Sequence, residues 1–79
     1  MLSSRSVEIL LLLTNGGLRF SDIVYTLDVN PKVASASLDE LIFVGLVRKG
    51  DGKYYLTGRG LRAATIVRNA YDRVFSVSP

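Results

Sequence analysis

Residues 18–60 of the chain read LRFSDIVYTLDVNPKVASASLDELIFVGLVRKGDGKYYLTGRG. The first part of this stretch has apolar residues at helical spacing twice, over 21–27 and over 31–44. Asn30 directly before Pro31 is a strong start signal for the second helix, because Asn is a favoured N-cap and Pro is favoured at the first helical position. The pattern predicts two short helices joined by a tight turn at residues 28–30.

The second part of the stretch changes to a period of two residues from Leu46 onward. Alternating segments lie on both sides of Gly50-Asp51-Gly52, a sequence typical of a hairpin turn. We therefore predict a β-hairpin over 46–57. Three cations flank its tip: Arg48, Lys49 and Lys53.

Outside this stretch, two further helices are predicted, over 4–14 and over 61–77. Asn15-Gly16-Gly17 ends the first, residues 18–20 are extended, and Gly58-Arg59-Gly60 breaks the last strand. Both helices carry more apolar surface than a chain of 79 residues easily buries, which predicts a homodimer joined through them. The residues assigned to that interface are Ile9, Leu12, Leu13, Ile66, Ala70 and Val77.

The length and composition restrict the possible functions. Seventy-nine residues suffice for one domain, 1–79, and the absence of Cys and His removes thiolate chemistry, most metal ligation and the usual acid–base catalysis. Neither a phosphate-binding glycine motif nor an arranged pair of catalytic side chains is present, so we expect a protein that is not an enzyme. The longest apolar run, Ile9 to Leu13, is too short to cross a membrane. We expect a cytoplasmic protein without a cofactor or a small-molecule ligand.

The charge is distributed unevenly along the chain. Residues 1–47 hold three Lys or Arg and five carboxylates, a net charge of −2, whereas residues 48–79 hold seven cations and two carboxylates, a net charge of +5. A concentration of positive charge of this kind favours a polyanionic partner.

The order of these elements resembles that of winged helix-turn-helix transcription regulators. The residues that carry the resemblance are Arg19-Phe20-Ser21-Asp22-Ile23, Leu27-Asp28-Val29-Asn30-Pro31, Ala34-Ser35, Leu38-Asp39-Glu40-Leu41, Gly45-Leu46-Val47-Arg48 and Tyr55-Leu56-Thr57-Gly58-Arg59-Gly60. They resemble the arsenical-repressor-type and multiple-antibiotic-resistance-type regulators, and the compact forms found in archaea and their viruses. The resemblance implies a mainly α (α+β) fold: a three-helix core, a β-hairpin wing and a C-terminal dimerisation helix.

It also implies a double-stranded DNA partner, with helix 31–44 as the recognition helix in the major groove and the wing on phosphates or the minor groove. The DNA-contacting residues assigned on this basis are Lys32, Val33, Ser35, Ala36, Ser37, Arg48, Lys49, Lys53, Arg19, Ser21 and Tyr25. The alternative for Ser21 is a helix cap. Asp39 and Glu40 are expected to point away from phosphate or toward basic residues. The assignment requires the hairpin tip and the start of the recognition helix to share one exposed side.

Two other functions remain open at the level of sequence. Winged helices also act as protein–protein interaction modules, which bind no DNA. The start of helix 31–44 contains no Arg, Asn or Gln for bidentate base contacts, so nonspecific architectural DNA binding is a third hypothesis.

Overall fold

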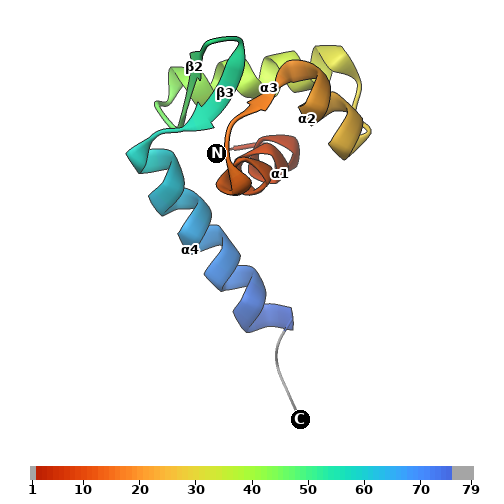
Figure 1. Cartoon of the computed structure of the whole chain (residues 1–79). Coiled ribbons are helices and arrows are strands. Elements are labelled where there is room, and N and C mark those ends of the chain that lie inside the picture. The colour runs from red at the N-terminus through yellow and green to blue at the C-terminus, as the bar shows by residue number, and fades with distance from the viewer. Residues whose placement is uncertain (1, 76–79) are drawn as a thin grey trace.

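The computed structural model describes residues 2–75, without the side chain of Phe75. The elements follow in the order α1 (Ser4–Leu12), η1 (Leu13–Asn15), β1 (Leu18–Arg19), α2 (Phe20–Leu27), α3 (Pro31–Phe43), β2 (Val47–Gly50), β3 (Lys53–Leu56) and α4 (Gly58–Phe75). Figure 1 shows α1, α2 and α3 gathered with the hairpin, while α4 leaves this body and projects away from it. The mainly α fold with a winged hairpin is confirmed.

The three strands form one antiparallel sheet in the order β1-β3-β2. In the hairpin, Val47 pairs with Leu56 and Gly50 pairs with Lys53. β1 adds a short third strand on the other edge of β3, where Leu18 pairs with Tyr54. Residues 18 and 19 of the extended segment predicted at 18–20 are thus part of the sheet, whereas Phe20 already begins α2. This short strand connects the root of the wing to the helices.

One hydrophobic core joins the three helices, the sheet and the start of α4. Its buried members are Ile9, Leu10, Leu13, Ile23, Leu38, Leu41, Val47 and Ala64. Two of them, Ile9 and Leu13, are only 1% and 3% exposed, and Leu12 packs partly buried against the same cluster. The assignment of Ile9 and Leu13 to a dimer interface was therefore wrong. The first helix is apolar on several sides, and these two residues lie on sides that pack into the core of the same chain.

The last helix begins three residues earlier than predicted, at Gly58 instead of residue 61. Thr57 provides the start signal: its Oγ1 accepts a hydrogen bond from the Gly60 N–H (3.0 Å) and donates one to the Gly45 carbonyl (2.7 Å). Gly60 is buried in the first turn, so the two glycines belong to the helix instead of separating it from the strand. The predicted end at residue 77 and the interface residue Val77 lie outside the described residues.

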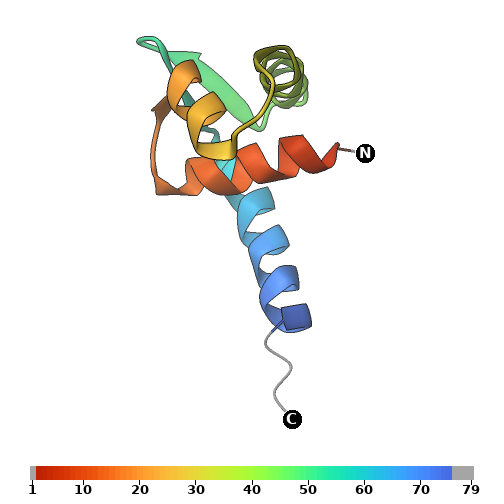
Figure 2. The ribbon, with the colours of Figure 1, turned by 90° about the vertical axis from the view of Figure 1, so that its right-hand side faces the viewer.

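Beyond its first turns, α4 has little contact with the rest of the chain. Ala64 is buried in the core, whereas every side chain from Arg68 to Val74 is exposed. Figures 1 and 2 show the helix extending away from the body in both views. Arg68 still reaches back to η1, where its Nη2 donates to Thr14 Oγ1 (2.7 Å). Within residues 2–75, no helix is both long enough and apolar enough to span a membrane.

Candidate nucleic-acid interface

The start of α3 is built as the sequence predicted. The Asn30 side chain caps the helix, with Oδ1 accepting from the Lys32 N–H (2.8 Å), and Pro31 occupies the first turn. Four of the five α3 residues assigned to DNA contact are exposed: Lys32, Val33, Ser35 and Ala36. This leading end of the helix is therefore open to a partner.

The fifth assigned residue, Ser37, is only 7% exposed, so its prediction as a contact residue was wrong. It lies three residues after buried Ala34 and four before buried Leu41, which places it on the inner stripe of the helix. Ile42, the residue after buried Leu41, is 39% exposed.

The two acidic residues of α3 have different surroundings. Glu40 turns toward α1, where its Oε1 accepts from Ser6 Oγ at 2.6 Å. Asp39 is exposed, seven residues after Lys32 and thus on the same side of the helix. It forms no ion pair with a cation of the described chain, so the second of the two expected orientations, toward a basic residue, is not found.

The wing ends in a two-residue turn at Asp51 and Gly52, whose φ values of 52° and 75° match the type I′ geometry of tight hairpins. Arg48 and Lys49 are exposed and Lys53 is half-buried. Within the described part of the chain, no carboxylate forms an ion pair with any of these three cations. Their charge therefore remains available to an anion.

The wing cations are divided between the two faces of the hairpin. Lys49 lies opposite Tyr54, with Nζ 5.4 Å from the ring centroid, on the face that continues into buried Val47. Arg48 lies opposite Tyr55 on the other face, 4.6 Å from that ring. Residues of one strand alternate between faces, so a groove that admitted the hairpin would meet positive charge on both walls.

Tyr55 also fixes the root of the wing. A Cβ atom built on Gly17 would overlap the Tyr55 ring, so the ring lies directly against the backbone of the segment between η1 and β1. Tyr54 and Tyr55 point to opposite faces of their strand, and Tyr54 packs against the core.

The residues assigned at the start of α2, Arg19, Ser21 and Tyr25, are all exposed. Ser21 does not cap this helix. Instead, Arg19 is the N-cap residue and the Asp22 carboxylate accepts from its N–H (3.4 Å), so Ser21 is the second residue of the helix.

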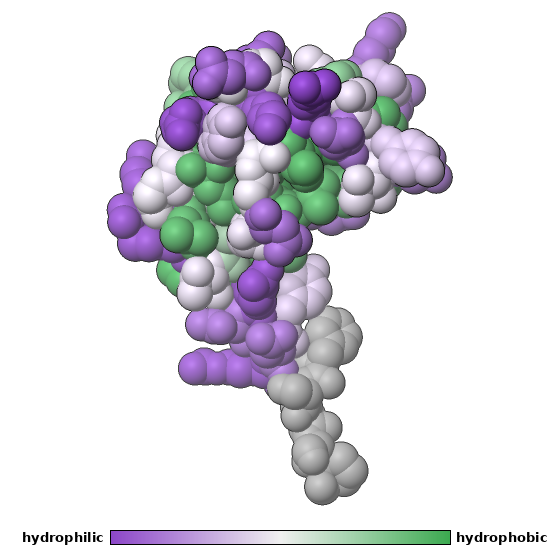
Figure 3. Space-filling view, in the orientation of Figure 1, coloured by the Kyte–Doolittle hydropathy of each residue, from purple (hydrophilic) through white to green (hydrophobic). Residues whose placement is uncertain are grey.

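The hairpin tip and α3 lie on the same side of the body. Figures 1 and 2 show both at the top, whereas α4 projects from the opposite side. In the space-filling view of the same orientation, hydrophilic side chains dominate the upper rim and apolar ones gather lower, toward the start of α4 (Figure 3). The geometric requirement set by the sequence is thus satisfied.

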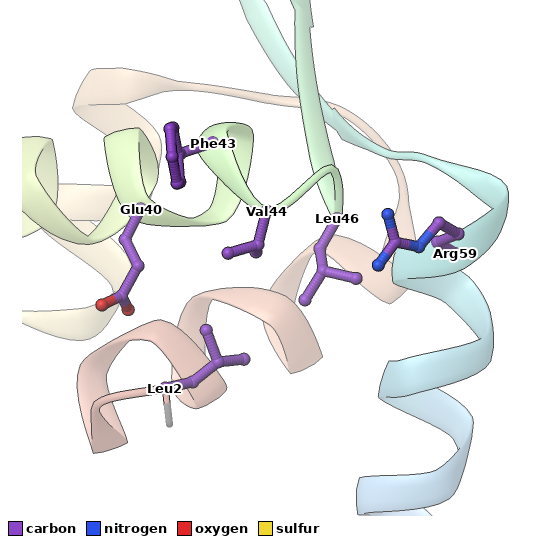
Figure 4. A pocket seen from close by; sticks show the side chains of 6 residues that line it. All are labelled: Leu2, Glu40, Phe43, Val44, Leu46 and Arg59. Carbon is purple, nitrogen blue, oxygen red and sulfur yellow. The ribbon is translucent and has the colours of Figure 1, made fainter.

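A shallow hollow of about 440 Å³ lies near the other end of α3. In Figure 4, Glu40 and Arg59 lie at opposite sides of it, with Val44 and Leu46 between them. Phe43 borders the hollow and is 90% exposed. Phe43 was not among the residues predicted to contact a partner, although it lies eleven residues after Lys32, a helical spacing that places it on the outward side.

Among the described residues, no three Asp or Glu side chains gather into a group that could hold a metal ion. The exposed start of α3 and the wing cations offer hydrogen-bonding groups, positive charge and apolar contact.

Comparison with known proteins agrees with this description. A family model described as winged helix-turn-helix matches residues 6–74. No curated protein matches the chain. Among solved structures, the chain is similar to a mutant form of ZitR from Lactococcus lactis, with a TM-score of 0.85 at 19% identity, covering 96% of this chain and 57% of that one.

It is also similar to the adhesin competence repressor AdcR from Streptococcus pyogenes, with a TM-score of 0.87 at 18% identity over 96% of this chain and 61% of AdcR. A MarR family protein of Mycobacterium tuberculosis matches with a TM-score of 0.76 at 26% identity over 95% of this chain and 61% of that protein. The chain thus spans about three fifths of the length of these proteins. Since the family model covers most of its length, the chain belongs to the winged helix-turn-helix family.

Proposed function

We propose that the chain is a double-stranded DNA-binding transcription regulator without enzymatic activity that acts in the cytoplasm. The proposal rests on one observation: the start of α3 and the cationic wing tip lie on the same side of the body. α3 is 13 residues long, about 20 Å at 1.5 Å per residue, and fits a major groove about 12 Å wide. Lys32, Val33, Ser35 and Ala36 then face base edges.

In this arrangement the wing contacts phosphates or the minor groove beside α3. Cations on both faces of the hairpin suit a groove only about 6 Å wide, which has a phosphate strand on each wall. Arg19, Ser21 and Tyr25 on α2 contact the backbone that borders the major groove.

Fluorescence anisotropy with a labelled duplex at increasing salt tests the proposal. We expect log K to fall linearly with log salt, with a slope of about −0.9 for each phosphate contacted. The tested duplexes differ in sequence, because equal affinity for all of them would favour architectural binding over regulation.

A second candidate function is protein–protein interaction, favoured by Phe43 at the edge of the hollow beside α3. Large exposed aromatic side chains are common anchors of protein interfaces. Failure to bind any duplex at 50 mM salt would favour this function over DNA regulation.

The regulator acts as a homodimer in our proposal, paired through α4. Ile66 and Val74 are 69% and 66% exposed, and Ala70 lies between them on the same side of the helix. A pairing through these residues would bury the apolar surface that the chain itself leaves open. The two recognition helices of such a dimer would read half-sites about 34 Å apart.

We expect Ile66→Asp to weaken the dimer about 100-fold, equivalent to about 2.7 kcal/mol, because a two-fold axis would bury the new carboxylate twice. Thr65→Asp places the same charge on the other side of α4 and should leave the dimer intact. Sedimentation equilibrium measures both. A monomeric wild-type chain at 100 µM, or equal loss in both variants, would contradict pairing through α4.

A further inference from the structure

The outward face of α3 carries both a cation, Lys32, and an anion, Asp39, two helical turns apart. Lys32, Ser35, Ala36 and Asp39 follow the i, i+3, i+4, i+7 spacing of a single helix face, and all four are exposed. Asp39 is the one acidic residue of the four. A carboxylate there is unexpected on a surface that meets phosphates, since none of the described cations neutralises it.

The groove itself offers a partner for such a carboxylate. In the major groove, cytosine presents its N4 amino group as a donor, whereas adenine presents a donor beside the N7 acceptor. Asn and Gln, which donate and accept, suit adenine, but an ionised carboxylate only accepts. An Asp39 oxygen is therefore attracted by cytosine N4 and repelled by the acceptors of guanine, thymine and adenine.

The distance to Lys32 fits the spacing of the bases. Seven residues of α-helix rise about 10.5 Å, and successive bases along a strand lie about 3.4 Å apart. Asp39 and Lys32 can therefore address positions about three base pairs apart. Lys32 prefers the acceptors of guanine or a phosphate at its end of the face.

We propose that Asp39 is a specificity-determining residue that accepts a hydrogen bond from a cytosine amino group in the major groove and disfavours duplexes lacking cytosine there. This inference rests on the proposed DNA-binding function. It also explains how a helix without Arg, Asn or Gln at its start can discriminate sequences. Repulsion by Asp39 lowers the affinity for most sites, and a cytosine amino group at the right position restores it.

Selection of bound sequences from a pool of random duplexes tests the proposal, with wild type, Asp39→Ala and Asp39→Asn. We expect a fixed cytosine at one position of the wild-type site, favoured roughly 5- to 150-fold over other bases, the range of one good base contact. Asp39→Ala should lose the preference at that position alone. Asp39→Asn should move it toward adenine, because its amide supplies both a donor and an acceptor.

Glu8→Gln is the matched control. Glu8 lies on α1, where its carboxylate pairs with Arg5 at 3.1 Å, so its substitution removes one negative charge outside the α3 face that holds Asp39 and should leave the selected sequence unchanged. A cytosine preference that survives Asp39→Ala, or a variant that merely binds every duplex more tightly, would overturn the role of Asp39 while DNA binding stands. Absence of binding by the wild type would overturn the proposed function itself.

Discussion

Replacing Gly60 with alanine is expected to lower the free energy of unfolding by about 3 kcal/mol, the upper range for overpacking a core. A Cβ at this position would overlap the carbonyl oxygen of Leu46 and lie 3.3 Å from the Leu56 side chain. The Leu46 carbonyl cannot easily withdraw, because it accepts the Thr57 N–H at 3.0 Å while the Thr57 hydroxyl holds the Gly45 carbonyl. The start of α4 must move instead.

Gly58→Ala is the control for this substitution, since it lies in the same turn and a Cβ there meets only the end of the Arg62 side chain at 3.7 Å. Thermal and urea unfolding of both variants provide the measurement. For a domain of this size, about 3 kcal/mol corresponds to a melting temperature lower by roughly 12–24 °C. Equal stability of the two variants would show that the close approach of Gly60 to Leu46 does not constrain the fold.

Charge reversal in the wing should produce the largest effect on DNA affinity. In the variant Lys49→Glu with Lys53→Glu, loss of two phosphate contacts would make the salt slope shallower by about 1.8. Extrapolated from 1 M to 0.1 M salt, the same two contacts correspond to a loss of affinity of roughly 60-fold. The anisotropy titration described above measures both quantities.

The matched control is Arg5→Glu with Arg68→Glu, which makes the same change in net charge on exposed residues of α1 and of the side of α4 opposite Ile66. We expect its slope to stay close to that of the wild type, with sedimentation confirming an unchanged assembly. Equal losses in the two double variants would mean that net charge, and not the position of the wing, governs binding.

Local signals made most of the fold predictable. The two residues Asn30-Pro31 are enough to mark the start of α3, and the three residues Gly50-Asp51-Gly52 are enough to mark the hairpin turn. The start of α4 was misjudged because glycine usually interrupts a helix, whereas Gly60 is required here by its approach to Leu46, a residue of another segment. Such a requirement arises from tertiary packing and leaves no trace in local spacing.

The candidate site was predictable to a similar degree. Exposure at Lys32, Arg48 and Lys49 followed from the helical and alternating patterns. Ser37 and Ile9 were misplaced for one reason: a small polar residue and an apolar residue on a helix with several apolar sides are both compatible with an inner or an outer position. The neighbouring helix decides between them, and a single sequence does not contain that information.

Selection can act on the projecting half of α4 separately from the surface formed by α3 and the wing. Apart from Arg68, which donates to Thr14, the side chains of this half up to Val74 lie outside the buried core, so their exchange leaves the surface formed by α3 and the wing in place. In the proposed dimer, substitutions in this part of α4 would change the choice of partner while the proposed DNA-binding surface stayed the same, or the reverse. A different helix grafted after Arg68 would likewise leave α3 and the wing unchanged.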